Sequence, residues 1–483
     1  MAKLPVAKFV SVSLLYYLWF KFRRGEIRGG ENNDITENPM KFYNREKELE
    51  LLARTREIAF NNHSQMTAIT GRRRIGKTKL ILKSCEGTPT VYLFVSRNNE
   101  AALCQQFAQT TSKSLDTFIP AEISSFVGLF EMLMNLGKNL SFNLIIDEFQ
   151  EFFYINPAIY SGMQDVWDRY KDTTRVNFIA SGSVYTLMHR IFMEYREPLY
   201  GRCDNIVKLK SFTPSIIKKI LADYNPKYTN DDLLALYTFT GGVPKYIEIL
   251  LDKGCYTIND MVDCLLQENS IFLEEGNILL IQEFGKKYGN YYAILSAIAS
   301  GRNTSAEISE SIGNTSAGGL LQRLEEDYEV IAKKRPILSK EGSQTVRYEI
   351  SDNFLRFWFR YIVKYQSYIQ SGLLNDLAGI VKNDYPTYSG IMLEKYFREQ
   401  LIEKQLYSNI GSWWEASKGK DKEQHEIDIV AIYAHEKKVL VAEVKRQRKN
   451  FKPELFQEKV EAIRTKLFFN YETETACFTL DDM

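Results

Sequence analysis

The chain has 483 residues, too many for one hydrophobic core, and its length predicts about three domains. Its 62 Lys and Arg residues nearly balance 61 Asp and Glu residues, so the net charge of +1 gives no overall attraction to nucleic acid or to a membrane surface. The six cysteines are scattered without a Cys-x-x-Cys pair, which argues against a zinc site or a disulfide framework and favours a reducing, cytoplasmic setting.

The first 39 residues contain an apolar segment with two interpretations. Residues 9–20 (FVSVSLLYYLWF) are uncharged and are followed by several basic residues, so they could form a signal anchor that leaves the rest of the chain in the cytoplasm. The segment is short for a membrane span, which needs about 20 apolar residues. The favoured interpretation is a tail or a misassigned start before globular sequence that begins near Met40, without obligate membrane association.

A phosphate-binding loop is expected directly after an apolar run that ends at Ile69. The octapeptide GRRRIGKT has the pattern Gly-x-x-x-x-Gly-Lys-Thr in a strand–loop–helix setting, which turns several backbone N–H groups toward one polyphosphate. Lys77 would reach the β- and γ-phosphates, and the Thr78 hydroxyl would occupy one position on Mg²⁺. The alternative for the octapeptide alone is a polar surface turn. The residues predicted to bind ATP are Gly71, Arg72, Arg73, Arg74, Ile75, Gly76, Lys77 and Thr78.

Residues 144–149 (LIIDEF) are predicted to form an apolar strand that ends in two acids. Asp147 is suited to hold Mg²⁺ through its water shell, and Glu148 is suited to orient or deprotonate the water that attacks the γ-phosphate. A further strand at residues 177–180 leads to Ser183, whose hydroxyl could sense the γ-phosphate. Strands that alternate with helical segments indicate an α/β fold with a parallel sheet, whose ligand lies beyond the carboxyl ends of the strands.

Six motifs occur in an order that resembles archaeal and bacterial P-loop ATPases related to the STAND and AAA+ classes. They are Asn44-Arg45-Glu46, GRRRIGKT, LIIDEF, IASGS, Tyr200-Gly201-Arg202 and Gly241-Gly242-Val243-Pro244. The resemblance implies that Arg45 belongs to a segment bordering the adenine pocket and that the Gly-Gly-Val-Pro turn opens a helix of a lid. It also implies that Arg202 is an arginine finger or sensor; an ordinary surface arginine is the alternative. If Arg202 acted on a second copy, the protein would be a homo-oligomer.

Residues 291–350 are expected to form three helices and then a hairpin. Thr304 and Glu307 have the spacing of a capping box that opens the second helix, and two strand-like runs bracket a polar turn. This order resembles a winged helix-turn-helix, whose third helix enters the major groove in DNA-binding members. The expected third helix, residues 315–328, ends in acids that would repel phosphates, so a packing module is favoured, while basic residues near the wing keep DNA contact open.

The rear of the chain places acids and a lysine in two apolar strands. Asp428 lies in one of them, and the next presents Glu443 and Lys445 on one face because strand side chains alternate. A metal-dependent phosphodiesterase needs two carboxylates for Mg²⁺ and a lysine that activates water. These residues resemble the PD-(D/E)XK nuclease fold, with Glu394 matching the acid on the preceding helix. The basic run after Lys445 suits DNA, and a pair of solvated strand faces is the alternative.

The preferred function is an Mg²⁺-dependent ATPase coupled to a nuclease-like domain that acts on DNA. The alternatives are a STAND-like nucleotide-controlled switch whose nuclease-like domain does not cut, and a winged-helix DNA-binding regulator. The expected parts are a tail (1–39), a P-loop ATPase core (40–210), a helical lid (211–284), a winged helix with an aromatic docking helix (285–385) and an α/β nuclease-like domain (386–483).

Overall fold

The structure is a computed structural model that describes residues 40–483 except residues 121, 286–287, 314–315, 341–345 and 416–424. The apolar segment at residues 9–20 lies outside the described residues. Among the helices that are described, none is long and apolar enough to cross a membrane.

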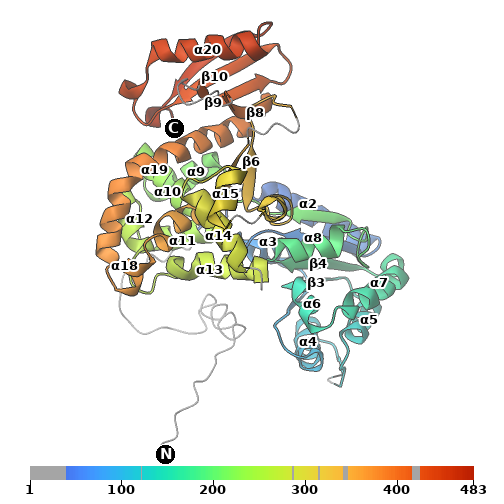
Figure 1. Ribbon diagram of the computed structural model, residues 1–483. Helices are drawn as coiled ribbons and strands as arrows, with labels where there is room; N and C mark the ends of the chain where they lie inside the picture. Colours follow the sequence, from blue (N-terminus) through green and yellow to red (C-terminus); the bar gives the residue numbers. More distant parts are fainter. Residues whose placement is uncertain (1–39, 121, 286–287, 314–315, 341–345, 416–424) are drawn as a thin grey trace, which may run out of the picture. The chain divides into compact units, whose positions relative to one another are not determined.

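A five-stranded parallel sheet forms the centre of the first domain (Figure 1). The strands at its centre are buried along their whole length, as expected when helices cover both faces. This confirms the predicted α/β fold class. In spatial order the strands are β2 (Thr90–Phe94), β3 (Phe142–Asp147), β4 (Val176–Gly182), β1 (Gln65–Thr70) and β5 (Asn205–Lys208).

Helices on both faces complete the core of this domain. One face packs against α2 (Glu46–Asn61) and α3 (Lys77–Ser84), through residues such as Leu52 and Leu80. The other face packs against a more aromatic layer, which contains Phe107, Phe130 and Trp167. The helices of that second layer are α4 (Glu100–Leu115), α5 (Phe126–Leu136), α7 (Ala158–Tyr170) and α8 (Tyr185–Met193).

In the described chain five helices follow the sheet; they are called the lid helices because the sequence predicts a lid over these residues. The Gly-Gly-Val-Pro turn opens α11 as the sequence predicts, with Gly241 and Gly242 at φ values of 57° and 71°. A side chain at position 242 would collide with the backbone of Phe212, since an added Cβ would lie 2.2 Å from its carbonyl oxygen. The five helices are α9 (Pro214–Tyr224), α10 (Asn230–Thr240), α11 (Pro244–Asp252), α12 (Ile258–Leu265) and α13 (Ile271–Phe284).

The middle of the chain forms the expected three helices and hairpin. Thr304 and Glu307 make the predicted capping box. The third helix is shorter than expected because the chain turns back after Glu326: the Val330 N–H donates to the Leu324 carbonyl, and Glu329 adopts a left-handed φ of 51°. The elements are α14 (Tyr288–Ala299), α15 (Ser305–Ser311), α16 (Gly318–Glu326), β6 (Ile331–Lys334) and β7 (Arg347–Ile350).

The aromatic segment after this hairpin is buried, as expected of a docking helix. It forms α17 (Asn353–Phe357) and continues into a π-helical turn (Trp358–Val363). The Trp358 ring is 2% exposed, and its Nε1 donates to the Leu273 carbonyl oxygen at 3.0 Å. The ring lies against Gly276 of α13, where an added Cβ would meet it at 2.2 Å.

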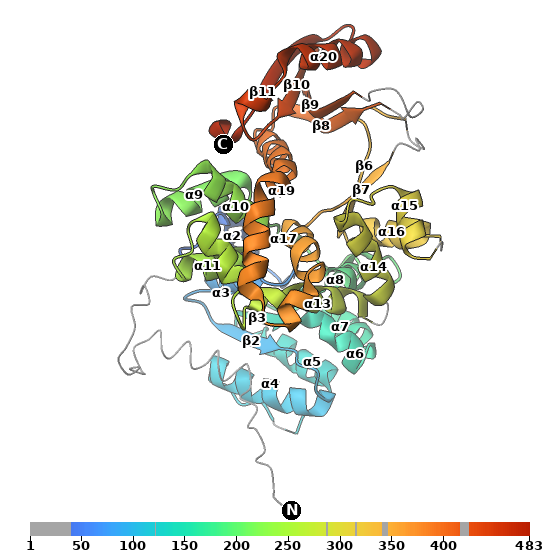
Figure 2. The ribbon, with the colours of Figure 1, turned by 60° about the vertical axis from the view of Figure 1, so that its left-hand side comes forward.

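One long helix, α19 (Leu374–Glu403), connects the lid helices to the C-terminal sheet (Figure 2). The domain boundary predicted at residue 386 falls inside α19. Pro386 and Gly390 weaken the local helix signal. Burial of Tyr385, Tyr388 and Met392 along one stripe stabilises the helix nonetheless.

The last domain is a four-stranded mixed sheet crossed by one helix. Strand β10 pairs in parallel with β11 and antiparallel with β9, and β8 forms the other edge. The parallel pairing requires a crossover, which α20 provides. The elements are β8 (Tyr407–Trp414), β9 (Glu426–Tyr433), β10 (Lys438–Val444), α20 (Pro453–Leu467) and β11 (Glu472–Phe478).

We expect Gly276→Ala to destabilise the protein by about 1–3 kcal/mol, because the new methyl group overlaps the buried Trp358 ring and the core must shift. Gly289→Ala is the matched control: this helical glycine has no atom within 4 Å of an added Cβ, so alanine should stabilise by about 0.5–1 kcal/mol. Denaturant unfolding followed by circular dichroism measures both. Equal stability of Gly276→Ala and wild type would contradict the tight packing between α13 and the Trp358 turn.

Candidate functional site

The phosphate loop lies between β1 and α3, beyond the carboxyl ends of the parallel strands. Gly71 and Gly76 have φ values of 148° and 94°, which suit glycine. At Gly71 space is also restricted, since an added Cβ would lie 2.9 Å from the Leu209 carbonyl oxygen. Gly76 directly precedes α3, so the loop N–H groups and the start of the helix face the same site. The structure thus contains the strand, loop and helix that the sequence predicts.

Lys77 is held inside this loop. Its side chain is buried, and Nζ donates to the carbonyl oxygens of Gly71 and Arg72 at 2.6 and 3.1 Å. Burial lowers the pKa of Lys77, while the negative charges of Glu148 and Asp147 oppose the shift. The ammonium group therefore lies where a bound polyphosphate would stabilise its charge.

The magnesium ligands predicted from distant parts of the sequence are neighbours in the structure. Asp147 ends β3 and is 4% exposed. The Thr78 hydroxyl donates to Asp147 Oδ2 at 3.0 Å, and the Tyr92 hydroxyl donates to the same oxygen at 2.6 Å. A threonine hydroxyl beside a carboxylate is a donor set that Mg²⁺ accepts, with waters and phosphate oxygens completing the octahedron.

Glu148 adopts an unusual backbone conformation and is held by two donors. Its φ of 53° is left-handed, which costs a non-glycine residue about 1–2 kcal/mol. Its Oε2 accepts from Ser183 Oγ at 2.7 Å and from Gln150 Nε2 at 2.5 Å. The structure therefore brings together Glu148 and Ser183, which the sequence analysis treats separately. Gln150, fully buried, was missed; its only sequence signal is its place in the run Asp-Glu-Phe-Gln.

Arg202 lies near the amino ends of the parallel strands, whereas the P-loop of its own chain follows their carboxyl ends. The Asp204 N–H donates to the carbonyl of Met66 near the start of β1, whereas the P-loop follows the end of that strand. The guanidinium pairs with Asp168 at 3.0 Å. The structure does not bring Arg202 to the loop, and contact with a bound phosphate would require a second copy of the chain.

Arg45 joins the segment before α2 to the beginning of the lid. Its side chain is buried, donates to the Lys210 carbonyl oxygen at 2.7 Å and lies 5.3 Å from the Phe212 ring centre. Its predicted place beside the adenine remains a prediction.

The three loop arginines differ in their surroundings. Arg72 forms an ion pair with Asp352, and its Nη2 donates to the Tyr246 hydroxyl at 3.1 Å. Arg74 pairs with Glu275 at 2.9 Å. Arg73 has no hydrogen bond or ion pair with any residue that the structure describes. The side chains of Arg72 and Arg74 are thus engaged by later elements, which the sequence analysis did not foresee.

Glu283, near the end of α13, approaches the site from the lid. Its carboxylate accepts from the Tyr185 N–H at 3.2 Å and from the Thr186 hydroxyl at 3.4 Å, at the start of α8. Burial raises the pKa of Glu283 to about 7, and hydrogen bonding and the charge of Lys77 act against this shift. No motif marks Glu275 or Glu283, because a single acid in a helical pattern usually faces solvent.

The predicted residues of the rear site also converge. Lys445 Nζ lies 3.0 Å from Glu443 and 3.6 Å from Asp428. Burial and the nearby charge of Asp428 raise the pKa of Glu394 to about 7. Lys459 of α20, which the sequence analysis missed, also pairs with Glu443 at 3.0 Å. Within the described ranges no group of three or more His, Cys, Asp and Glu side chains could hold a metal ion.

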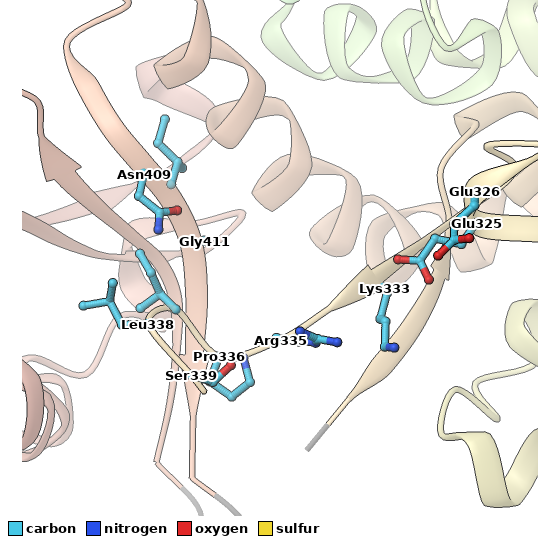
Figure 3. A pocket seen from close by; sticks show the side chains of 11 residues that line it. Glu325, Glu326, Lys333, Arg335, Pro336, Leu338, Ser339, Asn409 and Gly411 are labelled. Atoms are coloured by element: carbon cyan, nitrogen blue, oxygen red, sulfur yellow. The ribbon is translucent and has the colours of Figure 1, made fainter. Parts of the chain in front are cut away.

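A polar pocket of about 520 Å³ lies between the hairpin and β8 (Figure 3). The segment after β6 lines it, and there Pro336 pairs with Ser412 in an isolated parallel bridge. Acidic and basic side chains both line it, including Glu325, Lys333 and Arg335. The pocket therefore favours neither anions nor cations.

Two protein-family models match parts of the chain. The model of an ATPase domain predominantly from Archaea matches residues 42–250, and the model of archaeal and bacterial proteins of unknown function matches residues 358–460. The Walker-type ATPase Paby2304 of Pyrococcus abyssi superposes with a TM-score of 0.51 at 18% identity, over 68% of this chain and 99% of that chain. This likeness shows a shared fold.

A relative in Methanocaldococcus jannaschii, the uncharacterized protein MJECL04, is 33% identical over 414 residues, which cover 84% of this chain and 87% of that protein. The chain belongs to the same family as this protein, and its first domain is an ATPase domain of predominantly archaeal type.

Proposed function

We propose that the protein binds ATP with Mg²⁺ at the P-loop and hydrolyses it. One observation carries this proposal: Lys77, the Thr78–Asp147 pair and Glu148 lie together at the carboxyl edge of one parallel sheet. A polyphosphate site, a metal position and a carboxylate base are the parts that phosphoryl transfer to water requires.

Each side chain has a distinct task in this reaction. The loop N–H groups and Lys77 hold the phosphate oxygens, and a bound Mg²⁺ would supply further charge neutralisation. Glu148 orients the attacking water and accepts its proton as the water oxygen bonds to the γ-phosphorus and ADP leaves. Ser183 and Gln150 donate to Glu148, so they fix its carboxylate relative to the site.

As a second activity we propose Mg²⁺-dependent cleavage of DNA by the C-terminal domain. The convergence of Asp428, Glu443 and Lys445 beside Glu394 supports it. The ion pairs of Lys445 and Lys459 oppose it, because they occupy the carboxylates that a metal needs. If these lysines stay in place, the C-terminal domain does not cut and serves as a binding platform. The protein then acts as a nucleotide-controlled switch in the cytoplasm. In an oligomer, Arg202 would reach the P-loop of a second copy.

We expect Lys77→Ala to reduce ATP turnover by about 100-fold or more, because it removes a buried charge that phosphate oxygens would contact. Lys79→Ala, on the same helix but half exposed, is the control and should retain turnover. Phosphate release measured with both variants tests the P-loop assignment. Unchanged turnover in Lys77→Ala would remove the central argument for an ATPase.

Glu148→Gln should lower turnover by about 100-fold while ATP binding is retained, since the amide keeps the size of the side chain but cannot accept the proton from water. Glu151→Gln, which alters a carboxylate that pairs with Arg97 outside the loop, should leave both quantities unchanged. Calorimetric titration with ATP and single-turnover hydrolysis separate binding from chemistry. Loss of binding in Glu148→Gln would show that the side chain is structural.

For the second activity, wild type should nick supercoiled DNA in the presence of Mg²⁺, and Glu443→Ala should not. Glu472→Ala, an exposed acid on β11, is the matched control and should cut like wild type. Removal of Mg²⁺ with EDTA should also stop cleavage, because the carboxylates act only through the metal. A wild type that cuts neither DNA nor RNA with Mg²⁺ would exclude the nuclease proposal and leave the platform.

A further inference from the structure

The P-loop is tied to the lid by a continuous polar network. Asp352, the N-cap of α17, pairs with Arg72, which donates to the Tyr246 hydroxyl. That hydroxyl donates to Glu275 at 3.0 Å, and Glu275 pairs with Arg74. The two loop arginines therefore pair directly with acids on two helices, and Tyr246 of α11 links Arg72 to Glu275.

Because this network is buried, its charged groups need partners within the protein. Glu275 is 0% exposed, and Tyr246 is also fully buried. A carboxylate removed from water is stable only when its charge is paired and its oxygens accept hydrogen bonds. Tyr246 donates to Glu275 Oε1, and Arg74 places its positive charge 2.9 Å from Oε2, which makes no hydrogen bond with any described residue. The charge of Glu275 is therefore compensated mainly by this ion pair, which holds α13 against the loop.

The backbone of the loop also indicates a role for the Arg74 side chain. Arg74 has a φ of 67°, in the left-handed region that glycine adopts freely and that costs another residue about 1–2 kcal/mol. Glycine at this position would remove the strain but also the ion pair. The contacts of the guanidinium with Glu275 and, at 5.9 Å, with the Tyr246 ring compensate for the strained backbone.

Helix α13 touches the ATPase core at a second point. Glu283 accepts from the start of α8, two residues after Ser183. Glu275 and Glu283 are eight residues apart, which is about 12 Å along a helix. Between them, Gly276 packs against the Trp358 ring, so α13 connects the P-loop and α8 with the segment that follows the hairpin.

We propose that Arg72 and Arg74 are positioning residues that fix α11, α13 and α17 on the P-loop, and that their side chains do not bind phosphate. The proposal rests on the proposed ATPase function and deepens it. Its consequence is that the geometry of the loop depends on the docking of α11, α13 and α17. Any partner that moves these helices would change ATP turnover without touching the nucleotide.

A double-mutant cycle in ATP turnover tests this proposal. Arg74→Met and Glu275→Gln should each lower kcat/KM by about tenfold, and the double variant should be no worse than the poorer single variant, because both changes break one contact. Affinities for ATP and ADP should fall by the same factor, since the arginine does not meet the γ-phosphate. Arg169→Met, which breaks an exposed ion pair with Glu131 between α7 and α5, is the matched control and should behave like wild type.

The opposite pattern would overturn the proposal. A phosphate ligand at Arg74 predicts that Arg74→Met weakens ATP more than ADP, that Glu275→Gln leaves or tightens ATP binding, and that the two effects add. The same cycle in nucleotide-free unfolding, repeated with Arg72→Met and Asp352→Asn, measures the coupling without any reaction. If wild type turns over no ATP, the proposed function fails; if wild type is active and neither pair is coupled, the positioning role fails.

Discussion

The parallel register of β1, β3 and β4 is the constraint on which the ATP site depends. Asp147 lies opposite Ser181, and Thr70 lies opposite Gly182, so three strands end at the same level. The segments that leave these ends carry the phosphate loop, Glu148 and Ser183. A slip of one residue would move every side chain of a strand to the other face of the sheet, away from the helices against which it packs.

The position of the lid helices relative to the sheet depends on buried ion pairs. Its apolar helices share one core with α17 and α19, and that core alone would permit small shifts of the lid relative to the sheet. Ion pairs such as Arg74–Glu275 have a defined geometry and lose much free energy when one partner is displaced. Apolar burial therefore holds the lid together, and the arginines of the loop determine where it docks.

The sequence predicted what short patterns encode. GRRRIGKT and LIIDEF each lie within one loop or strand, and their chemistry follows from residue type and spacing. The partners of these motifs were not predictable, because Arg72 meets Asp352 and Arg74 meets Glu275 across some 200 residues or more of chain. The full length of α19 was not predicted for a related reason. Its proline and glycine are local signals against a helix, whereas the burial that stabilises it comes from contacts with other domains.

The two acidic sites differ in what already neutralises their carboxylates. Asp147 accepts hydrogen bonds from the neutral hydroxyls of Thr78 and Tyr92, so its charge remains available to a cation. Glu443 contacts the ammonium groups of Lys445 and Lys459, which compensate its charge. A metal ion that enters the rear site must first displace a lysine from Glu443 and compensate for the lost ion pair. At the P-loop, a metal ion would only replace the hydrogen bond of a neutral hydroxyl to Asp147. The proposed Mg²⁺ site at the P-loop therefore needs no carboxylate released from an ion pair, whereas the proposed cleavage at the rear site requires that a lysine be displaced first.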